Sequence, residues 1–251
     1  MSKINNDNLM IFQKGFNYSQ DGPGNRLVYH LSGCNMCCPW CSNPEGLTQS
    51  KSNTVLSVND LVAEAEASRM IMIDGGGVTF TGGEVTLQKE AVLSAVKLLK
   101  EKGISTCIET NASLPQCEEL FNEVDFMIAD FKSPFKEKLK EFTDGDIDVI
   151  KNNLLFRAKT KKPLLVRIPL IHFFNCGEAN ATEFAEFFNF LKKESNSDEL
   201  YFEILTYHEF GKDKYKKIGK NYSVTDGFVT EEDVKLLKNK LISFDLKIVN
   251  T

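Results

Sequence analysis

Short, apolar, β-rich segments alternate with longer amphipathic segments along most of the chain, and this alternation constrains the fold more than any other feature. Six segments have the length and composition of buried strands: residues 26–31, 78–81, 105–109, 126–130, 164–170 and 201–205. Four stretches repeat apolar residues at helical spacing: 57–70, 87–102, 182–193 and 230–241. Strands that are separated by helices pair in parallel, so the pattern predicts an α/β fold, either a barrel or an open sheet.

Length and composition narrow the class of protein. The 251 residues are enough for one large domain, and no repeat or linker divides residues 1–251. A net charge of −5 without a basic stripe argues against a general nucleic-acid-binding protein. The sequence begins without an apolar signal region and has no apolar run as long as a membrane span. We therefore expect a cytoplasmic protein that does not insert into membranes.

Three cysteines are crowded into one loop directly after the first predicted strand. Cys34, Cys38 and Cys41 lie in the run Cys34-Asn-Met-Cys-Cys-Pro-Trp-Cys41. Three thiolates can bind three corners of a [4Fe–4S] cluster and leave its fourth iron open to chemistry. Trp40 beside the last cysteine is either an aromatic wall that shields such a cluster or a filler of the core. The spacing predicts a catalytic iron–sulfur cluster.

A structural zinc site is the alternative interpretation of the same loop. Such sites close four ligands around the metal, usually as two pairs. No second pair is evident, because Cys107, Cys117 and Cys176 show no cysteine or histidine at ligand spacing. Cys37 is so near the other three that a tetrahedron including it would be strained. We therefore favour an iron–sulfur cluster on three cysteines, with Cys37 outside the ligand set.

A second motif, Thr81-Gly-Gly-Glu84, follows the second predicted strand. Paired glycines let the backbone approach a ligand closely, and a carboxylate such as Glu84 accepts hydrogen bonds from an ammonium group. A Gly-Gly pair alone is most often just a turn. The carboxyl ends of parallel strands, however, carry the working residues of α/β folds. Its place next to the cysteine loop therefore makes this turn a candidate binding site.

Further motifs lie at or near other strand ends: Asp21-Gly-Pro-Gly-Asn-Arg26, Ser42-Asn-Pro-Glu45, Gly75-Gly-Gly-Val-Thr-Phe-Thr-Gly-Gly-Glu84, Glu109-Thr-Asn111, Asp130-Phe-Lys132 and Tyr207-His-Glu-Phe-Gly-Lys212. Together with the cysteines, they resemble the activases of glycyl radical enzymes in the radical S-adenosylmethionine (SAM) superfamily. The resemblance covers nearly the whole chain. It is strongest to the form that acts on pyruvate formate-lyase.

The resemblance implies a fold and a reaction. The fold would be a partial (β/α)₆ barrel of the TIM type, a radical SAM core formed by residues 1–251 as a single domain. One [4Fe–4S] cluster would bind the amino and carboxylate groups of SAM, and one electron would then break a C–S bond. The 5′-deoxyadenosyl radical would take a hydrogen atom from a backbone glycine of a partner, expected to be pyruvate formate-lyase, in anaerobic metabolism. Residues 43–82 contain no cysteine, so an external flavodoxin or ferredoxin is expected to supply the electron.

The same resemblance assigns roles to individual residues. Gly82, Gly83 and Glu84 would hold the ammonium group of SAM, Lys132 and Arg167 would meet its carboxylate, and His208 would lie near the adenine. Glu109 and Asp130, with the carbonyl oxygen of Ile128, would bind a monovalent cation. The full set of expected cofactor-binding residues is Trp40, Gly82, Gly83, Glu84, Glu109, Asn111, Asp130, Lys132, Arg167 and His208.

Three departures from the family pattern bear on the partner and the cation. Glu109 stands where these activases often have Asp, and Ala112 stands where glycine is more usual. The segment Ile171-His-Phe-Phe-Asn175 replaces a Pro-Gly turn near the expected entrance for the partner, where it would alter partner choice or only repack a rim. The alternatives are an activase for another glycyl radical enzyme, a radical SAM enzyme for a small molecule, and a non-catalytic iron–sulfur or zinc-binding interaction protein.

Overall fold

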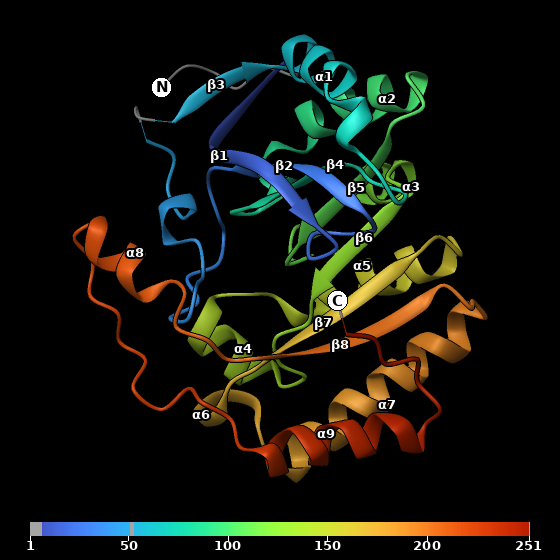
Figure 1. Ribbon diagram of the computed structural model, residues 1–251. Helices are drawn as coiled ribbons and strands as arrows, with labels where there is room; N and C mark the ends of the chain where they lie inside the picture. The colour runs from blue at the N-terminus through green and yellow to red at the C-terminus, as the bar shows by residue number, and fades with distance from the viewer. Residues whose placement is uncertain (1–6, 51–52, 251) are drawn as a thin grey trace. The chain divides into compact units, whose positions relative to one another are not determined.

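The computed structural model describes residues 7–50 and 53–250, and its strands form one sheet (Figure 1). The order in the sheet is β3-β1-β2-β4-β5-β6-β7-β8. The strands are β1 Asn8–Tyr18, β2 Asn25–Leu31, β3 Thr54–Ser57, β4 Gly77–Gly82, β5 Ser105–Thr110, β6 Phe126–Asp130, β7 Leu164–Leu170 and β8 Leu200–Thr206. The pairs β2–β4, β4–β5 and β7–β8 are parallel. The predicted α/β fold, a partial (β/α)₆ barrel, is confirmed, and all six predicted strands are present.

The helices that follow the strands are α1 Val58–Ala67, α2 Lys89–Glu101, α3 Glu118–Glu123, α4 Lys136–Thr143, α5 Ile147–Lys159, α6 His172–Asn175, α7 Glu178–Ser195, α8 Lys212–Lys217 and α9 Glu231–Ser243. Local signals account for several ends. The Ser57 hydroxyl accepts a hydrogen bond from the Asp60 backbone N–H and caps α1, and Thr230 and Asp233 form a capping box at α9. Gly103, with φ of 66°, follows the end of α2.

Two strands were not predicted from the sequence, β1 and β3, and both pair antiparallel. The first half of β1 alternates between buried and partly buried residues, whereas its second half is mostly exposed and polar, which obscures the period-2 signal. Its register with β2 shifts between Ile11 and Gln13. The buried Gln88 amide compensates nearby, because it bonds to both the N–H and the carbonyl of Met10. A side chain that is distant in the sequence thus supplies hydrogen bonds to a strand that the local sequence indicates only weakly.

Contacts divide the chain into two compact units. Unit 1 runs to Asn35 and includes Glu45–Thr110 and Gln116–Ile128. Unit 2 holds Met36–Pro44, Asn111–Pro115 and the chain from Ala129 onward. The cysteine loop therefore contributes its first cysteine to unit 1 and the rest to unit 2.

Unit 1 is held together by a fully buried arginine, the last residue of the Asp21–Arg26 motif. The Arg26 guanidinium donates to the Thr79 hydroxyl at 2.7 Å, to the Val78 carbonyl at 2.8 Å and to the Ser105 carbonyl at 3.2 Å. These contacts join β2, β4 and β5 through one side chain. Burial lowers the pKa of Arg26, but a buried guanidinium is kept charged by such acceptors. The motif is therefore a structural element of the sheet.

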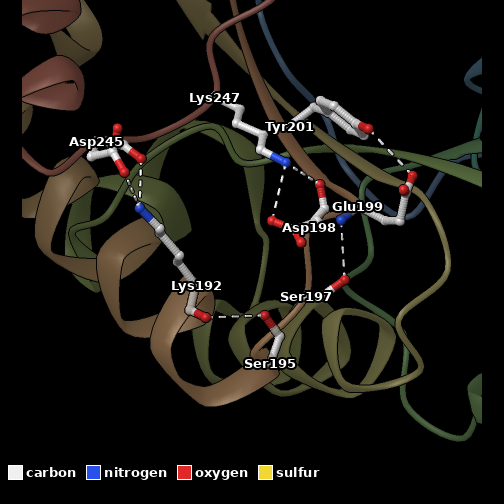
Figure 2. A network of polar contacts seen from close by, with 8 residues as sticks. All are labelled: Lys192, Ser195, Ser197, Asp198, Glu199, Tyr201, Asp245 and Lys247. Atoms are coloured by element: carbon white, nitrogen blue, oxygen red, sulfur yellow. Dashed lines mark hydrogen bonds and ion pairs between the residues drawn. The ribbon is translucent and has the colours of Figure 1, made fainter.

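In unit 2, α7 packs against α5 and α9. Polar contacts attach the C-terminal segment of the chain (Figure 2). Lys192 on α7 donates to the Asp245 carboxylate at 2.9 Å, and Lys247 donates to the Asp198 carbonyl at 2.7 Å. Exposed pairs of this kind contribute little free energy individually. The apolar contribution comes from phenylalanines of α7, of which Phe188 stacks on Phe202 of β8 at 4.4 Å between ring centres.

Helix α5 was not predicted from the sequence, because its buried face is partly polar. Its buried face includes Asn153 and Arg157 beside the apolar Ile150 and Leu154. The Asn153 amide donates to the carbonyls of Ala112 and Leu114, both at 2.8 Å. Polar residues that are buried for such contacts interrupt the apolar periodicity by which a helix is recognised.

Candidate functional site

The Gly-Gly turn and the start of the cysteine loop are joined by backbone hydrogen bonds within unit 1. The Gly83 N–H donates to the Leu31 carbonyl at 2.8 Å, and the Glu84 N–H donates to the Gly33 carbonyl at 2.7 Å. Gly33 is the residue before Cys34, whose own N–H donates to the Leu47 carbonyl at 3.3 Å. The ends of β2 and β4 are neighbours, as the parallel pattern predicted. The structure thus brings together two motifs that are about fifty residues apart in the sequence.

Gly83 is required by the closeness of this contact. A Cβ at this position would lie 2.0 Å from the Gly33 carbonyl oxygen and 2.7 Å from the Gly46 carbonyl oxygen. Both are backbone atoms, so no side-chain movement can relieve the overlap. The glycine lets the turn lie directly against the two ends of the loop that carries Cys34.

Glu84 is fully buried and is held by three hydrogen bonds to one carboxylate oxygen. Its Oε1 accepts from the Thr86 N–H at 2.9 Å, the Thr86 hydroxyl at 2.5 Å and the Thr110 hydroxyl at 2.6 Å. Buried carboxylates require such donors. Thr110, at the end of β5, was not singled out by sequence reasoning, because a threonine in a strand carries no distinguishing signal.

Glu109 lies next to Thr110 at the end of β5, and the two side chains have different partners. The Glu109 Oε2 accepts a hydrogen bond from the Thr81 hydroxyl at 2.6 Å. Glu84, after β4, thus bonds to a threonine of β5, and Glu109, in β5, bonds to a threonine of β4. The Glu109 side chain is therefore accommodated by an ordinary hydrogen bond.

The second part of the cysteine loop lies in unit 2 beside the Tyr207–Lys212 motif. The Cys41 N–H donates to the Cys38 carbonyl at 3.2 Å, and the same carbonyl accepts from the Tyr215 hydroxyl at 3.3 Å. Gly211 of the motif faces Cys41, because a Cβ there would lie 2.1 Å from the Cys41 carbonyl oxygen. The glycine of this motif is thus explained by close packing on the loop.

Trp40 belongs to an aromatic cluster within unit 2. Its ring centre lies 4.5 Å from that of Phe174 and 6.1 Å from that of Phe173. Phe142 contacts both phenylalanines, at 5.3 and 5.6 Å. The segment that departs from the family pattern therefore packs on the tryptophan of the cysteine loop. Trp40 is thus buried in this aromatic cluster.

The four cysteines of the loop differ in their exposure to solvent. Cys37 is exposed, whereas Cys34 and Cys41 are half-buried and Cys38 is buried. The structure describes all seven cysteines, and none of them forms a disulfide.

Asn111 begins a loop that is closed by its own side chain. Its Oδ1 accepts from the Ser113 N–H at 3.0 Å and from the Ser113 hydroxyl at 2.7 Å. Ala112 between them has φ of 53°, a conformation in which glycine is relaxed and alanine is strained. The observed φ gives a physical reason to expect glycine at this position.

Asp130 and Lys132 at the end of β6 form an ion pair of 2.8 Å between Nζ and Oδ2. The Lys132 side chain is almost completely buried, and its carbonyl accepts a hydrogen bond from the Asn175 amide at 2.8 Å. Asn175 also donates to the Pro169 carbonyl and so joins the ends of β6 and β7 to α6. The lysine is thus a buried cation, not a surface one.

Arg167 in β7 pairs with Glu203 in β8 in the interior of unit 2. The Arg167 Nε lies 2.8 Å from the Glu203 Oε2. Only 8% of Arg167 and 2% of Glu203 is exposed. Sequence reasoning singled out Arg167 but missed Glu203, since its partner is 36 residues away and no local pattern links them.

His208 follows β8, and its ring stacks on Phe210 with 4.0 Å between centres. Its Nδ1 accepts a hydrogen bond from the Phe210 N–H at 3.3 Å. Burial lowers the pKa of His208 below its usual range, so the imidazole is neutral at pH 7. With Nδ1 as the acceptor, the proton resides on Nε2, which is then a hydrogen-bond donor.

One interpretation from the sequence is wrong. Cys176 does have a histidine at ligand spacing, because His172 is four residues before it. In the structure a ring nitrogen of His172, the Cys176 Sγ and a carboxylate oxygen of Asp233 all lie within 4.8 Å of one another. Asp233 is distant from the other two in the sequence, so the three side chains come together only in the folded chain.

The comparisons with known proteins define the class of this chain. Residues 28–185 match the model of the Radical SAM superfamily. The chain therefore belongs to this superfamily and is an enzyme, and membership implies a [4Fe–4S] cluster and SAM as cofactors.

Particular relatives are similar along most of the chain. A pyruvate formate-lyase-activating enzyme of Staphylococcus aureus (strain USA300) is 28% identical over 237 residues, which are 91% of this chain and 92% of the relative. The crystal structure of a domain of pyruvate-formate lyase-activating enzyme from Bacteroides vulgatus ATCC 8482 matches with a TM-score of 0.56 and 26% identity, over 69% of this chain and 98% of that one.

A more distant structure shares the fold alone. Streptococcus suis SuiB, solved bound to S-adenosylmethionine, matches with a TM-score of 0.63 and 14% identity, over 89% of this chain and 49% of SuiB. Across the part of the chain that the structure describes, every helix is too short or too polar to cross a lipid bilayer.

Proposed function

We propose that this chain is the activase of a glycyl radical enzyme, with pyruvate formate-lyase as its partner. The observation that carries the proposal is the pair of backbone bonds that set the Gly83–Glu84 turn against Gly33, next to Cys34. Similarity to activating enzymes along 91% of the chain supports it. When bound, the cluster and SAM would supply reductive cleavage of SAM and a radical that takes a hydrogen atom from a glycine of the partner.

The residues of the chain fit this chemistry. Cysteine thiolates are the usual ligands of [4Fe–4S] clusters, and we propose that Cys34, Cys38 and Cys41 bind three of the four irons. Trp40, packed on Phe173 and Phe174, would exclude water from one side of the loop. The protein's contribution is to hold these groups rigidly and to keep the site dry.

We propose binding roles for the polar residues in the same terms. Gly82, Gly83 and Glu84 would hold the ammonium group of SAM on the turn, which hydrogen bonds from threonines keep rigid. Arg167 and Lys132 are buried cations, each oriented by a carboxylate of the chain, and they would meet the carboxylate of SAM. His208, with its donor Nε2, would meet the adenine, and Asn111 would line the same site.

Two further elements of the proposal concern the cation and the electron donor. Glu109 and Asp130, with the Ile128 carbonyl, would bind a monovalent cation, for which oxygen ligands are suitable. Flavodoxin or ferredoxin would deliver the electron. Residues 1–251 would act as one domain.

Anaerobic reconstitution tests the chemistry. We expect about four irons per chain and formation of 5′-deoxyadenosine from SAM after reduction with dithionite. Replacing Cys38 by Ala should abolish both, whereas Cys37→Ala, an exposed neighbour in the same loop, should retain them. Bound zinc without SAM cleavage would instead support the non-catalytic alternative.

Electron paramagnetic resonance tests the partner. Incubation with pyruvate formate-lyase, SAM and a reductant should produce the doublet of a glycyl radical on that enzyme. Iron incorporation and SAM cleavage serve as internal controls, because they depend on the activase alone. A doublet that appears only with another glycyl radical enzyme would show that the partner is wrong while the class of reaction is right.

A further inference from the structure

Outside the proposed radical site, unit 2 holds a cluster of three different metal-ligating side chains. His172 begins α6, Cys176 directly follows that helix, and Asp233 lies in the first turn of α9. One donor atom from each residue lies within 4.8 Å of the other two. The His172 Nδ1 and the Asp233 Oδ2 are already 3.3 Å apart.

The distances suit a tetrahedral metal better than a direct hydrogen bond. Zinc binds nitrogen and oxygen at about 2.0–2.2 Å and sulfur at about 2.3 Å, so donor atoms around it are separated by roughly 3.3–3.8 Å. The 3.3 Å between His172 and Asp233 equals one such edge, and it is longer than most hydrogen bonds. The thiol would need to move by at most about 1 Å to complete the triangle.

The charges of the three donors also match a divalent metal. A neutral imidazole, a thiolate and a carboxylate carry two negative charges together, which one dication would neutralise. Burial raises the pKa of the Cys176 thiol to about 12, so the group is a thiol until a metal displaces its proton into solvent. The mixed nitrogen, sulfur and oxygen set favours Zn²⁺ over Mg²⁺ or Ca²⁺, which prefer oxygen alone.

One ligand is held in place by further hydrogen bonds. The Asp233 Oδ2 accepts from the Thr230 N–H at 3.0 Å and from the Thr230 hydroxyl at 2.9 Å, as part of the cap of α9. Such outer hydrogen bonds orient metal ligands and strengthen their binding. The carboxylate is therefore fixed next to His172 before any metal arrives.

We propose that His172, Cys176 and Asp233 form a binding site for Zn²⁺ with a fourth position open to water. The metal would connect α6 to the start of α9. Helix α6 carries Phe173 and Phe174, which pack on Trp40 of the cysteine loop. The site would thus restrain the segment that covers Trp40, at a place where residues 61 positions apart meet.

Zinc retention by the cluster-loaded protein tests the proposal. Wild-type protein is incubated anaerobically with ZnCl₂, passed through a desalting column and analysed for zinc and iron by mass spectrometry. We expect about one zinc per chain in addition to the iron. Cys176→Ser, His172→Ala and Asp233→Asn should each weaken zinc binding by at least about tenfold, with iron content unchanged.

Two controls separate ligand loss from structural damage. Thr230→Val removes a hydroxyl of the α9 cap but retains the three donors, so zinc should still bind, more weakly than in wild type. Co²⁺ in place of Zn²⁺ provides a second readout, because the charge-transfer band of a thiolate–cobalt bond should be present in wild type and absent in Cys176→Ser.

The proposal is wrong if wild-type protein retains no zinc, or if Cys176→Ser and His172→Ala retain as much as wild type. His172 is exposed enough, at 42% of its side chain, that His172→Ala is expected to fold even if Cys176→Ser does not. The iron content and the yield of 5′-deoxyadenosine report on the radical chemistry separately. Loss of zinc with both retained would leave the proposed activase function intact.

Discussion

The buried ion pair of Arg167 and Glu203 allows a quantitative test of how unit 2 holds Arg167, a residue that we propose binds SAM. The perturbation is Glu203→Ala, which removes the carboxylate 2.8 Å from the Arg167 Nε and leaves the guanidinium buried. At that distance and an effective dielectric constant of about 20, the attraction that is lost is about 6 kcal/mol. Removing one partner of a buried pair costs about 3–5 kcal/mol after relaxation, and we expect a loss in this range.

Urea denaturation followed by circular dichroism measures this loss, with the slope m compared between variants to confirm that the unfolding transition is unchanged. The matched control is Glu119→Ala. Glu119 forms an ion pair of 2.7 Å with Lys97, but its side chain is 68% exposed. Its removal should cost less than about 1 kcal/mol, because exposed pairs are screened by water.

A third variant separates the charge from the packing. Arg167→Met combined with Glu203→Leu replaces the pair by apolar side chains and should recover most of the stability. SAM binding should nevertheless be weakened in this double variant, since the cation is gone. The reasoning would be refuted if Glu203→Ala lowered the free energy of unfolding by no more than Glu119→Ala does.

Three other predictions concern the turn, its threonine and the histidine near β8. Gly83→Ala should cost about 3 kcal/mol or more and prevent cluster incorporation, because its Cβ would overlap the Gly33 carbonyl, whereas Gly15→Ala, which meets nothing within 4 Å, should be almost neutral in thermal unfolding. Thr110→Val removes a donor from the buried Glu84 and should cost about 1–3 kcal/mol, while Thr54→Val at an exposed strand position should not; equal losses in urea denaturation would contradict this account. The lowered pKa of His208 means that the unfolded chain binds more protons below pH about 6.5, so stability contributed by the neutral imidazole is present above that pH and is lost as the pH falls toward the folded pKa. His208→Gln should remove this part of the pH dependence, and an unchanged profile would show that His208 does not titrate as argued.

Local patterns were sufficient for much of the fold. The strand β6 was predicted with its observed bounds, and the predicted helical stretches 57–70 and 230–241 begin at the residues that cap α1 and α9. The sequence did not reveal β1, whose outer half is polar, or α5, whose buried face includes polar residues. In each missed case the element depends on contacts with distant parts of the chain.

The candidate site likewise has parts that the sequence predicts and parts that only the tertiary structure determines. The cysteine run, the Gly-Gly turn and the strand-end acidic residues are recognisable from the sequence because their chemistry is carried by neighbouring residues. Which groups become partners was decided only in three dimensions: Glu203 with Arg167, Thr110 with Glu84, and Asp233 with His172 and Cys176. A buried polar group must find a partner wherever the folded chain brings one, because desolvation without compensation is costly. The spacing of residues along the sequence is therefore enough to predict the motifs, whereas tertiary packing decides which side chains become their partners.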